Sequence, residues 1–142
     1  MTTYLANAFS SSMLTLLPLD VEFSPVNEQE FCEEVVNGNP VNAIGHQSTV
    51  DLVNQLCGSS LKMNRVNITV DIGDEIYIVM LTTRLEEGKV LNKEEVTKMY
   101  QEGKVKFIKA KVYGAVLKQL TSCENICNEA EYDALAYKAK EG

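Results

Sequence analysis

The sequence predicts an α/β (α+β) fold: a single compact domain with a mixed central sheet flanked by helices, plus an appended C-terminal helical tail. Strand-like segments are mixed with helix-like segments along the first 113 residues. A length of 142 residues, with 45% hydrophobic and 23% charged residues, is typical of one globular domain. Two apolar segments, 66–70 and 76–81, are separated by a short turn and predict a central hairpin.

The first elements have recognisable boundaries. A short strand is expected over 3–6, and a second, over 21–25, ends at a proline. Asn27 and Glu30 have capping-box spacing and predict the start of a helix. The segment Asn37-Gly38-Asn39-Pro40 ends that helix.

A short strand over 41–44 then leads directly into a second helix. Ser48 and Asp51 again have capping-box spacing, so the helix is expected to begin there. Gly58 has the position of a C-cap.

The second half contains the clearest strand signal, the two-residue alternation over 66–70. The continuously apolar segment 76–81 predicts a central strand covered on both faces. Asn92 is expected to start a helix that ends near Gly103, and a last strand follows over 105–112. The remaining residues, 114–142, show two helical patterns of modest apolar content and form an appended tail.

Charge and hydropathy exclude several classes. The net charge of -7 and the pI near 4.7 exclude a broad basic face that grips DNA. No segment has the length of apolar sequence that a membrane span needs, and the apolar segment near the start lacks a signal peptide's basic region. We therefore expect a cytoplasmic protein without DNA or membrane partners.

The four cysteines, at positions 32, 57, 123 and 127, are too few and too scattered to predict a disulfide framework. Cys123 and Cys127 would share a helix face, but a metal site usually needs two further ligands. Buried free thiols are the simpler interpretation, and no metal or cofactor is expected.

Two segments place polar groups where a core does not need them. In the first, a strand delivers Gly45 and the only histidine, His46, to a helix start, where backbone N–H groups favour an anion. Histidine exchanges a proton near neutral pH, although a lone histidine at a helix start is more often a cap or surface residue. In the second, the apolar strand over 76–81 exits into Arg84 and Glu87, which form either a site at a strand end or a solvated loop.

Together, His46, Glu87 and an arginine make metal-free RNA cleavage plausible. That reaction needs a base at the 2′-oxygen, an acid at the 5′-oxygen and donors for the phosphorane charge. One histidine cannot hold both proton roles, so either Glu87 shares them, a second subunit contributes, or alignment of the 2′-oxygen suffices. Arg65, at the head of the segment 66–70, would bind phosphate or only decorate a sheet surface.

The sequence resembles the type III anti-CRISPR ring nucleases, small proteins of archaeal viruses and bacterial phages or prophages. The resemblance covers about residues 3–112, and the tail has no counterpart in the short viral members. It departs from the family pattern at Gln47 and Met80. It rests on five segments in matching order and spacing: Tyr4-Leu5-Ala6-Asn7-Ala8-Phe9-Ser10, Asn42-Ala43-Ile44-Gly45-His46, Leu56-Cys57-Gly58, Asn64-Arg65-Val66 and Arg84-Leu85-Glu86-Glu87-Gly88-Lys89.

The resemblance implies a ring-nuclease-like domain over 1–113, acting as a homodimer that binds cyclic tetra-adenylate at the dimer interface. It implies cleavage without metal to linear di-adenylate with a 2′,3′-cyclic phosphate, which switches off the immune nucleases that the messenger activates. His46 would be the general acid, Glu87 an assisting catalytic group and Arg84 a stabiliser of phosphate charge. The implied ligand-binding positions are Asn7, Ser10, Ser48 and Arg65. The alternative is a non-catalytic cyclic-oligoadenylate binding protein, acting as a sponge or sensor.

Overall fold

A computed structural model of the chain describes residues 1–15, 17–84 and 91–114. The element order in these ranges is β1 (Thr3–Ala6), a 3-10 turn η1 (Ser11–Met13), β2 (Leu19–Val26), α1 (Glu28–Asn37), β3 (Val41–Ala43), α2 (Gln47–Cys57), β4 (Glu75–Leu81), α3 (Lys93–Gln101) and β5 (Val105–Gly114). The predicted tail, from residue 115 onward, and the segment 85–90 lie outside the described residues.

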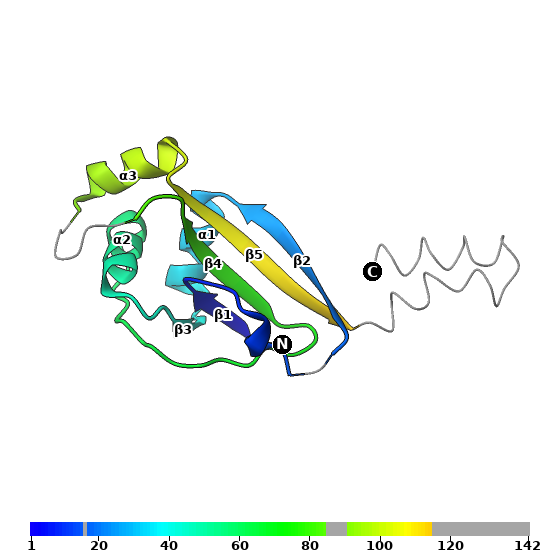
Figure 1. Cartoon of the computed structure of the whole chain (residues 1–142). Helices are drawn as coiled ribbons and strands as arrows, with labels where there is room; N and C mark the ends of the chain where they lie inside the picture. Colours follow the sequence, from blue (N-terminus) through cyan, green and yellow to red (C-terminus); the bar gives the residue numbers. More distant parts are fainter. Residues whose placement is uncertain (16, 85–90, 115–142) are drawn as a thin grey trace, which may run out of the picture.

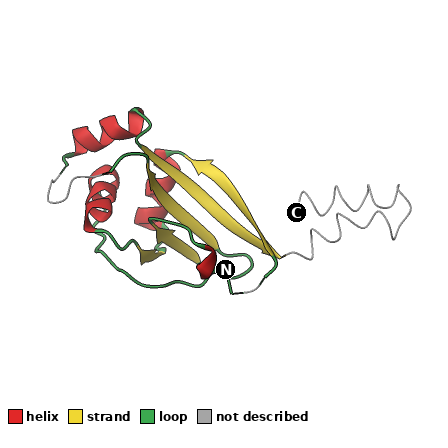
Figure 2. Ribbon diagram, viewed as in Figure 1, coloured by secondary structure: helices red, strands yellow, loops and turns green. Residues whose placement is uncertain are grey.

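The strands form one five-stranded mixed sheet in the order β2-β5-β4-β1-β3 (Figure 1). The strands β3, β1 and β4 are mutually parallel, whereas β5 runs antiparallel to both β4 and β2. The α-helices α1, α2 and α3 pack on one face of this sheet (Figure 2), which confirms the predicted α+β class with a mixed central sheet.

Two apolar clusters cover the two faces of the sheet. On the helical face, Phe31 of α1 stacks on Phe107 of β5 with ring centroids 4.0 Å apart. On the other face, Ile76 and Ile78 of β4 pack with Ile68 and Val70, which arrive from the long connection after α2. Because all four residues from Ile76 to Val79 are buried, the prediction of a doubly covered central strand is confirmed.

The predicted strand over 66–70 is wrong, and with it the central hairpin. Apart from an isolated bridge between Val70 and Leu14, this segment has no strand pairing. Ile68 and Val70 are buried against the sheet, while Val66 is 47% exposed. The two-residue alternation therefore reports an extended segment with one side on the core, not a hydrogen-bonded strand.

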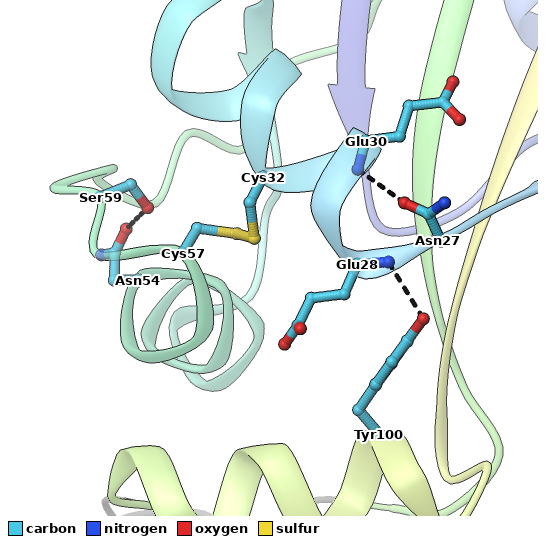
Figure 3. The surroundings of a disulfide bond; sticks show 8 residues. All are labelled: Asn27, Glu28, Glu30, Cys32, Asn54, Cys57, Ser59 and Tyr100. Atoms are coloured by element: carbon cyan, nitrogen blue, oxygen red, sulfur yellow. Dashed lines mark hydrogen bonds between the residues drawn. A yellow bond between two sulfur atoms is a disulfide. The ribbon is translucent and has the colours of Figure 1, made fainter.

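The expectation that Cys32 and Cys57 are free thiols is also wrong. They form a disulfide that joins α1 to α2 across a sequence separation of 25 residues (Figure 3). The link was hidden because only the packing of the two helices on one sheet face brings the two positions together. Near this link, the Tyr100 hydroxyl of α3 accepts a hydrogen bond of 3.0 Å from the Glu28 N–H, so the three helices are joined on this face.

Candidate functional site

The candidate site lies where the parallel strands β3, β1 and β4 end. Their carboxyl ends lie at one end of the sheet, which places Asn7 after β1, Gly45 and His46 after β3, and Arg84 beyond β4. Sites in α/β proteins concentrate at the carboxyl ends of the strands. The structure places these described residues at one end of the sheet, while Glu87 lies outside the described residues.

His46 is the N-cap residue of α2, and its exposed imidazole makes no cap hydrogen bond. The His46 carbonyl accepts the N–H of Val50 over 3.1 Å, closing the first helical turn. The N–H groups at the start of a helix have no partner within it, and together with the helix dipole they favour a negative charge. An imidazole and an anion-binding helix end therefore adjoin each other.

The predicted capping box of Ser48 and Asp51 is wrong, because the N-cap of α2 is His46, two residues before Ser48, and the helix begins at Gln47. Asp51 instead accepts a hydrogen bond of 2.8 Å from the side chain of Gln47, four residues before it. This places half-buried Ser48 inside the first turn, at the helix end that favours an anion.

Gly45 is held on both sides of its peptide backbone. Its N–H donates to Oδ1 of Asn7 over 3.0 Å. Its carbonyl oxygen accepts hydrogen bonds from Nε and Nη2 of Arg65, at 3.2 and 3.0 Å. Arg65 therefore lies beside the turn that carries His46, but it leads a coil segment and not the expected strand.

A cleft of about 200 Å³ opens beside this turn. Asn7, Gly45, His46 and Arg65 line it, so four residues that sequence analysis singled out share one hollow. The rest of its lining is apolar and comes from segments that were not expected to meet: Ala6, Ala8, Met13, Ala43, Val66 and Ile68. No local sequence signal marks these apolar residues, because their proximity depends on how the coil after α2 crosses the sheet.

Ser10 and Arg84 lie outside the lining of this cleft. Ser10 is the N-cap of η1, where its hydroxyl oxygen accepts the Ser12 N–H over 3.3 Å. Arg84 is exposed and follows the carboxyl end of β4, at the same end of the sheet as His46. The structure thus brings together Asn7, His46 and Arg65, and leaves Ser10 and Arg84 at the periphery.

A second, larger groove of about 610 Å³ is lined by residues of β2, β5 and β4 and by the end of α3. Its apolar lining includes Phe23, which is 55% exposed, and Met80, which is 36% exposed. Phe9 packs edge-on against Phe23, with ring centroids 5.5 Å apart. An exposed apolar surface of this kind typically marks an interaction site.

Within the described ranges, no group of three or more histidine, cysteine, aspartate or glutamate residues is placed to hold a metal ion. In the same ranges, none of the helices combines the length and the apolar character required to cross a membrane.

Comparison with known proteins identifies a family and several relatives that this chain resembles. The family described as STIV B116-like matches residues 3–107. An uncharacterized protein, ORF116 of Acidianus filamentous virus 1, is 44% identical over 116 residues, covering 82% of this chain and 100% of the relative. The solved structure of B116 of Sulfolobus turreted icosahedral virus has a TM-score of 0.72 and 42% identity, covering 78% of this chain and 99% of that one. An uncharacterized protein of Sulfolobus islandicus filamentous virus is 36% identical over 67 residues, covering 47% of this chain and 57% of the relative.

Proposed function

Because this chain belongs to the STIV B116-like family of archaeal viral proteins, we propose that it is a viral ring nuclease acting in the host cytoplasm. It cleaves cyclic tetra-adenylate without a metal, giving linear di-adenylate with a 2′,3′-cyclic phosphate, and thereby inhibits type III CRISPR immunity. The observation that carries this proposal is the exposed imidazole of His46 at the start of α2, beside a cleft lined by Asn7 and Arg65.

The arrangement suits an internal phosphoryl transfer. The ribose 2′-oxygen attacks the adjacent phosphorus, the bond from phosphorus to the 5′-oxygen breaks, and the cyclic phosphate forms. His46 donates the proton that the departing 5′-oxygen needs, and Glu87 assists by taking the proton of the 2′-hydroxyl. The N–H groups that open α2, together with Arg84, stabilise the charge on the phosphorane.

The size of the cleft supports a homodimer. A cleft of about 200 Å³ is smaller than the ~300 to 1,000 Å³ of ordinary ligand pockets, and a ring of four nucleotides is a large ligand. A second copy would supply the rest of the binding surface and a second His46. The apolar groove around Phe23 and Met80 offers a surface that such a copy could bury.

The same cleft fits the net charge of the protein. A ligand with four phosphates needs a few local donors and not a broad basic face, so a net charge of -7 is compatible with it. Arg65 supplies such donors, because only two of its five N–H groups are needed for the Gly45 carbonyl.

The test separates cleavage from binding. In His46→Ala, single-turnover cleavage of cyclic tetra-adenylate should fall at least a hundredfold, while the dissociation constant changes less than threefold. Asp51→Asn, which alters only the contact with Gln47 in the same helix, is the matched control and should keep the wild-type rate. Equal losses of rate and affinity in His46→Ala would contradict the role of general acid. Tight binding by a wild-type protein that never cleaves would indicate a sponge or sensor.

A further inference from the structure

The turn 42–45, which leads into His46, is weakly fixed by the sheet. It leaves β3, a strand of three residues at the edge of the sheet that pairs only with β1. An edge strand so short has few ladder hydrogen bonds to fix the direction in which the chain leaves it. The position of His46 therefore depends on contacts other than the hydrogen bonds of the sheet.

Two asparagines supply such contacts between the turn 42–45 and the coil 62–65. Oδ1 of Asn42 accepts the N–H of Ile44 over 3.0 Å, and Nδ2 of Asn42 donates to the Lys62 carbonyl over 2.6 Å. Nδ2 of Asn64 donates to the Asn42 carbonyl over 2.7 Å. The N–H of Asn64 donates to the Ile44 carbonyl over 2.8 Å.

A contact between Gly45 and Arg65 adds to these hydrogen bonds. Arg65, adjacent to Asn64, donates to the carbonyl of Gly45, the residue immediately before His46. The contact is close, because a Cβ added at Gly45 would lie 3.3 Å from both Cβ and Cγ of Arg65. The coil thus fixes the backbone of the turn up to the peptide that leads into His46.

We propose that Asn42 and Asn64 form an asparagine clamp that positions His46 for catalysis without touching the ligand. This inference rests on the proposed function. The two amides are neutral and lie in the outer part of the molecule, with Asn64 exposed and Asn42 half-buried. Hydrogen bonds there add little net stability, but they fix the direction of the catalytic side chain, and small misplacements of a reacting group slow a reaction strongly.

The test compares variants of the clamp with a matched control. Asn42→Ala and Asn64→Ala should each slow single-turnover cleavage of cyclic tetra-adenylate at least tenfold, with less than a threefold change in its dissociation constant. Asn54 is the control, because its amide also binds the coil after α2, at Leu61 and Ser59, but does not contact the turn 42–45. Asn54→Ala should lower the melting temperature at least as much, yet keep the wild-type rate.

A second measurement does not depend on catalysis. By NMR, amide hydrogen exchange at Ile44 and Gly45 should accelerate at least fivefold in both clamp variants and stay unchanged in Asn54→Ala. Unchanged exchange in the clamp variants would overturn the inference, as would wild-type cleavage or a loss of affinity equal to the loss of rate. If the wild-type protein does not cleave, the proposed function fails, while the exchange measurement still decides whether the clamp holds the turn.

Discussion

The guanidinium of Arg65 donates two hydrogen bonds to the carbonyl oxygen of Gly45, at 3.2 Å from Nε and 3.0 Å from Nη2. This contact connects a coil on the open face of the sheet to the residue that precedes His46. Both residues also line the same cleft. A ligand phosphate that binds the remaining donors of Arg65 would therefore meet a group already fixed in place, which reduces the entropy lost on binding.

The closeness of this contact predicts that Gly45→Ala impairs the site. The added Cβ would lie 3.3 Å from Cβ and 3.4 Å from Cα of Arg65, so the coil or the turn must shift. We expect a loss of about 1 kcal/mol in the free energy of unfolding and weaker binding of cyclic tetra-adenylate. Urea denaturation and a binding titration measure the two effects.

Gly58→Ala provides the matched control for this prediction. Gly58 ends α2 with φ of 69° and has open space around its α-carbon, so alanine there strains only the backbone. It should cost about 1 kcal/mol of stability as well, with unchanged affinity for the ligand. Equal losses of affinity in both variants would show that Gly45 matters only for stability.

The disulfide between Cys32 and Cys57 should stabilise the domain. It closes a loop with a sequence separation of 25 residues, for which the loss of unfolded-chain entropy predicts about 3 kcal/mol. Urea denaturation with and without reductant, compared with the double variant Cys32→Ser/Cys57→Ser, should show this difference. Alkylation of all four cysteines in denaturant without reductant would contradict the disulfide.

The raised pKa of Tyr77 predicts that the protein loses stability at high pH. Burial, with the nearby carboxylates of Glu34, Glu30 and Glu75, raises the pKa of Tyr77 from 10.0 to about 12. The stability that depends on its proton is complete below pH 10, where the folded and unfolded states are both protonated, and is lost as the pH rises toward 12. At pH 11 the loss should be about 1 kcal/mol.

The measurement is urea denaturation at pH 9 and pH 11 for the wild-type protein and for Tyr77→Phe. The phenylalanine variant cannot ionise at this position, so its stability should fall less over the same interval. An identical fall in the two proteins would assign the pH effect to other groups.

Asp74 should be more important for stability than its position in a turn suggests. It is only 6% exposed, and its two carboxylate oxygens accept the N–H groups of Thr2 and Asp71, each over 2.9 Å. Asp74→Asn replaces one acceptor by a donor that faces an N–H group, at a cost of about 1–3 kcal/mol. Asp71→Asn, which alters an exposed contact with Thr15, should cost less than half as much by the same denaturation measurement.

Local signals in the sequence predicted much of the fold correctly. The asparagine caps at Asn27 and Asn92 are made as expected, because a side-chain cap depends only on residues within one turn. The N-cap of α2 was misplaced by two residues, since His46 and not Ser48 takes that position, without a side-chain hydrogen bond. Here the short strand β3 and the contacts of Gly45 decide where the helix begins.

Features that depend on distant contacts could not be predicted. The alternation over 66–70 has the pattern of a strand, but pairing requires a free edge beside it, and β4 already has β1 and β5 as neighbours. The disulfide and the contact of Arg65 with Gly45 likewise follow from tertiary packing. The proximity of Asn7 and His46 could be inferred from the sequence, because the carboxyl ends of adjacent parallel strands lie at the same end of the sheet.

The most direct test of the central claim is incubation of the purified wild-type protein with radiolabelled cyclic tetra-adenylate in EDTA, with the products separated by chromatography. We expect linear di-adenylate with a 2′,3′-cyclic phosphate, because proton transfer by His46 and charge stabilisation by the helix end and Arg84 need no metal ion. Ligand that stays intact and does not bind the protein would contradict the proposed function.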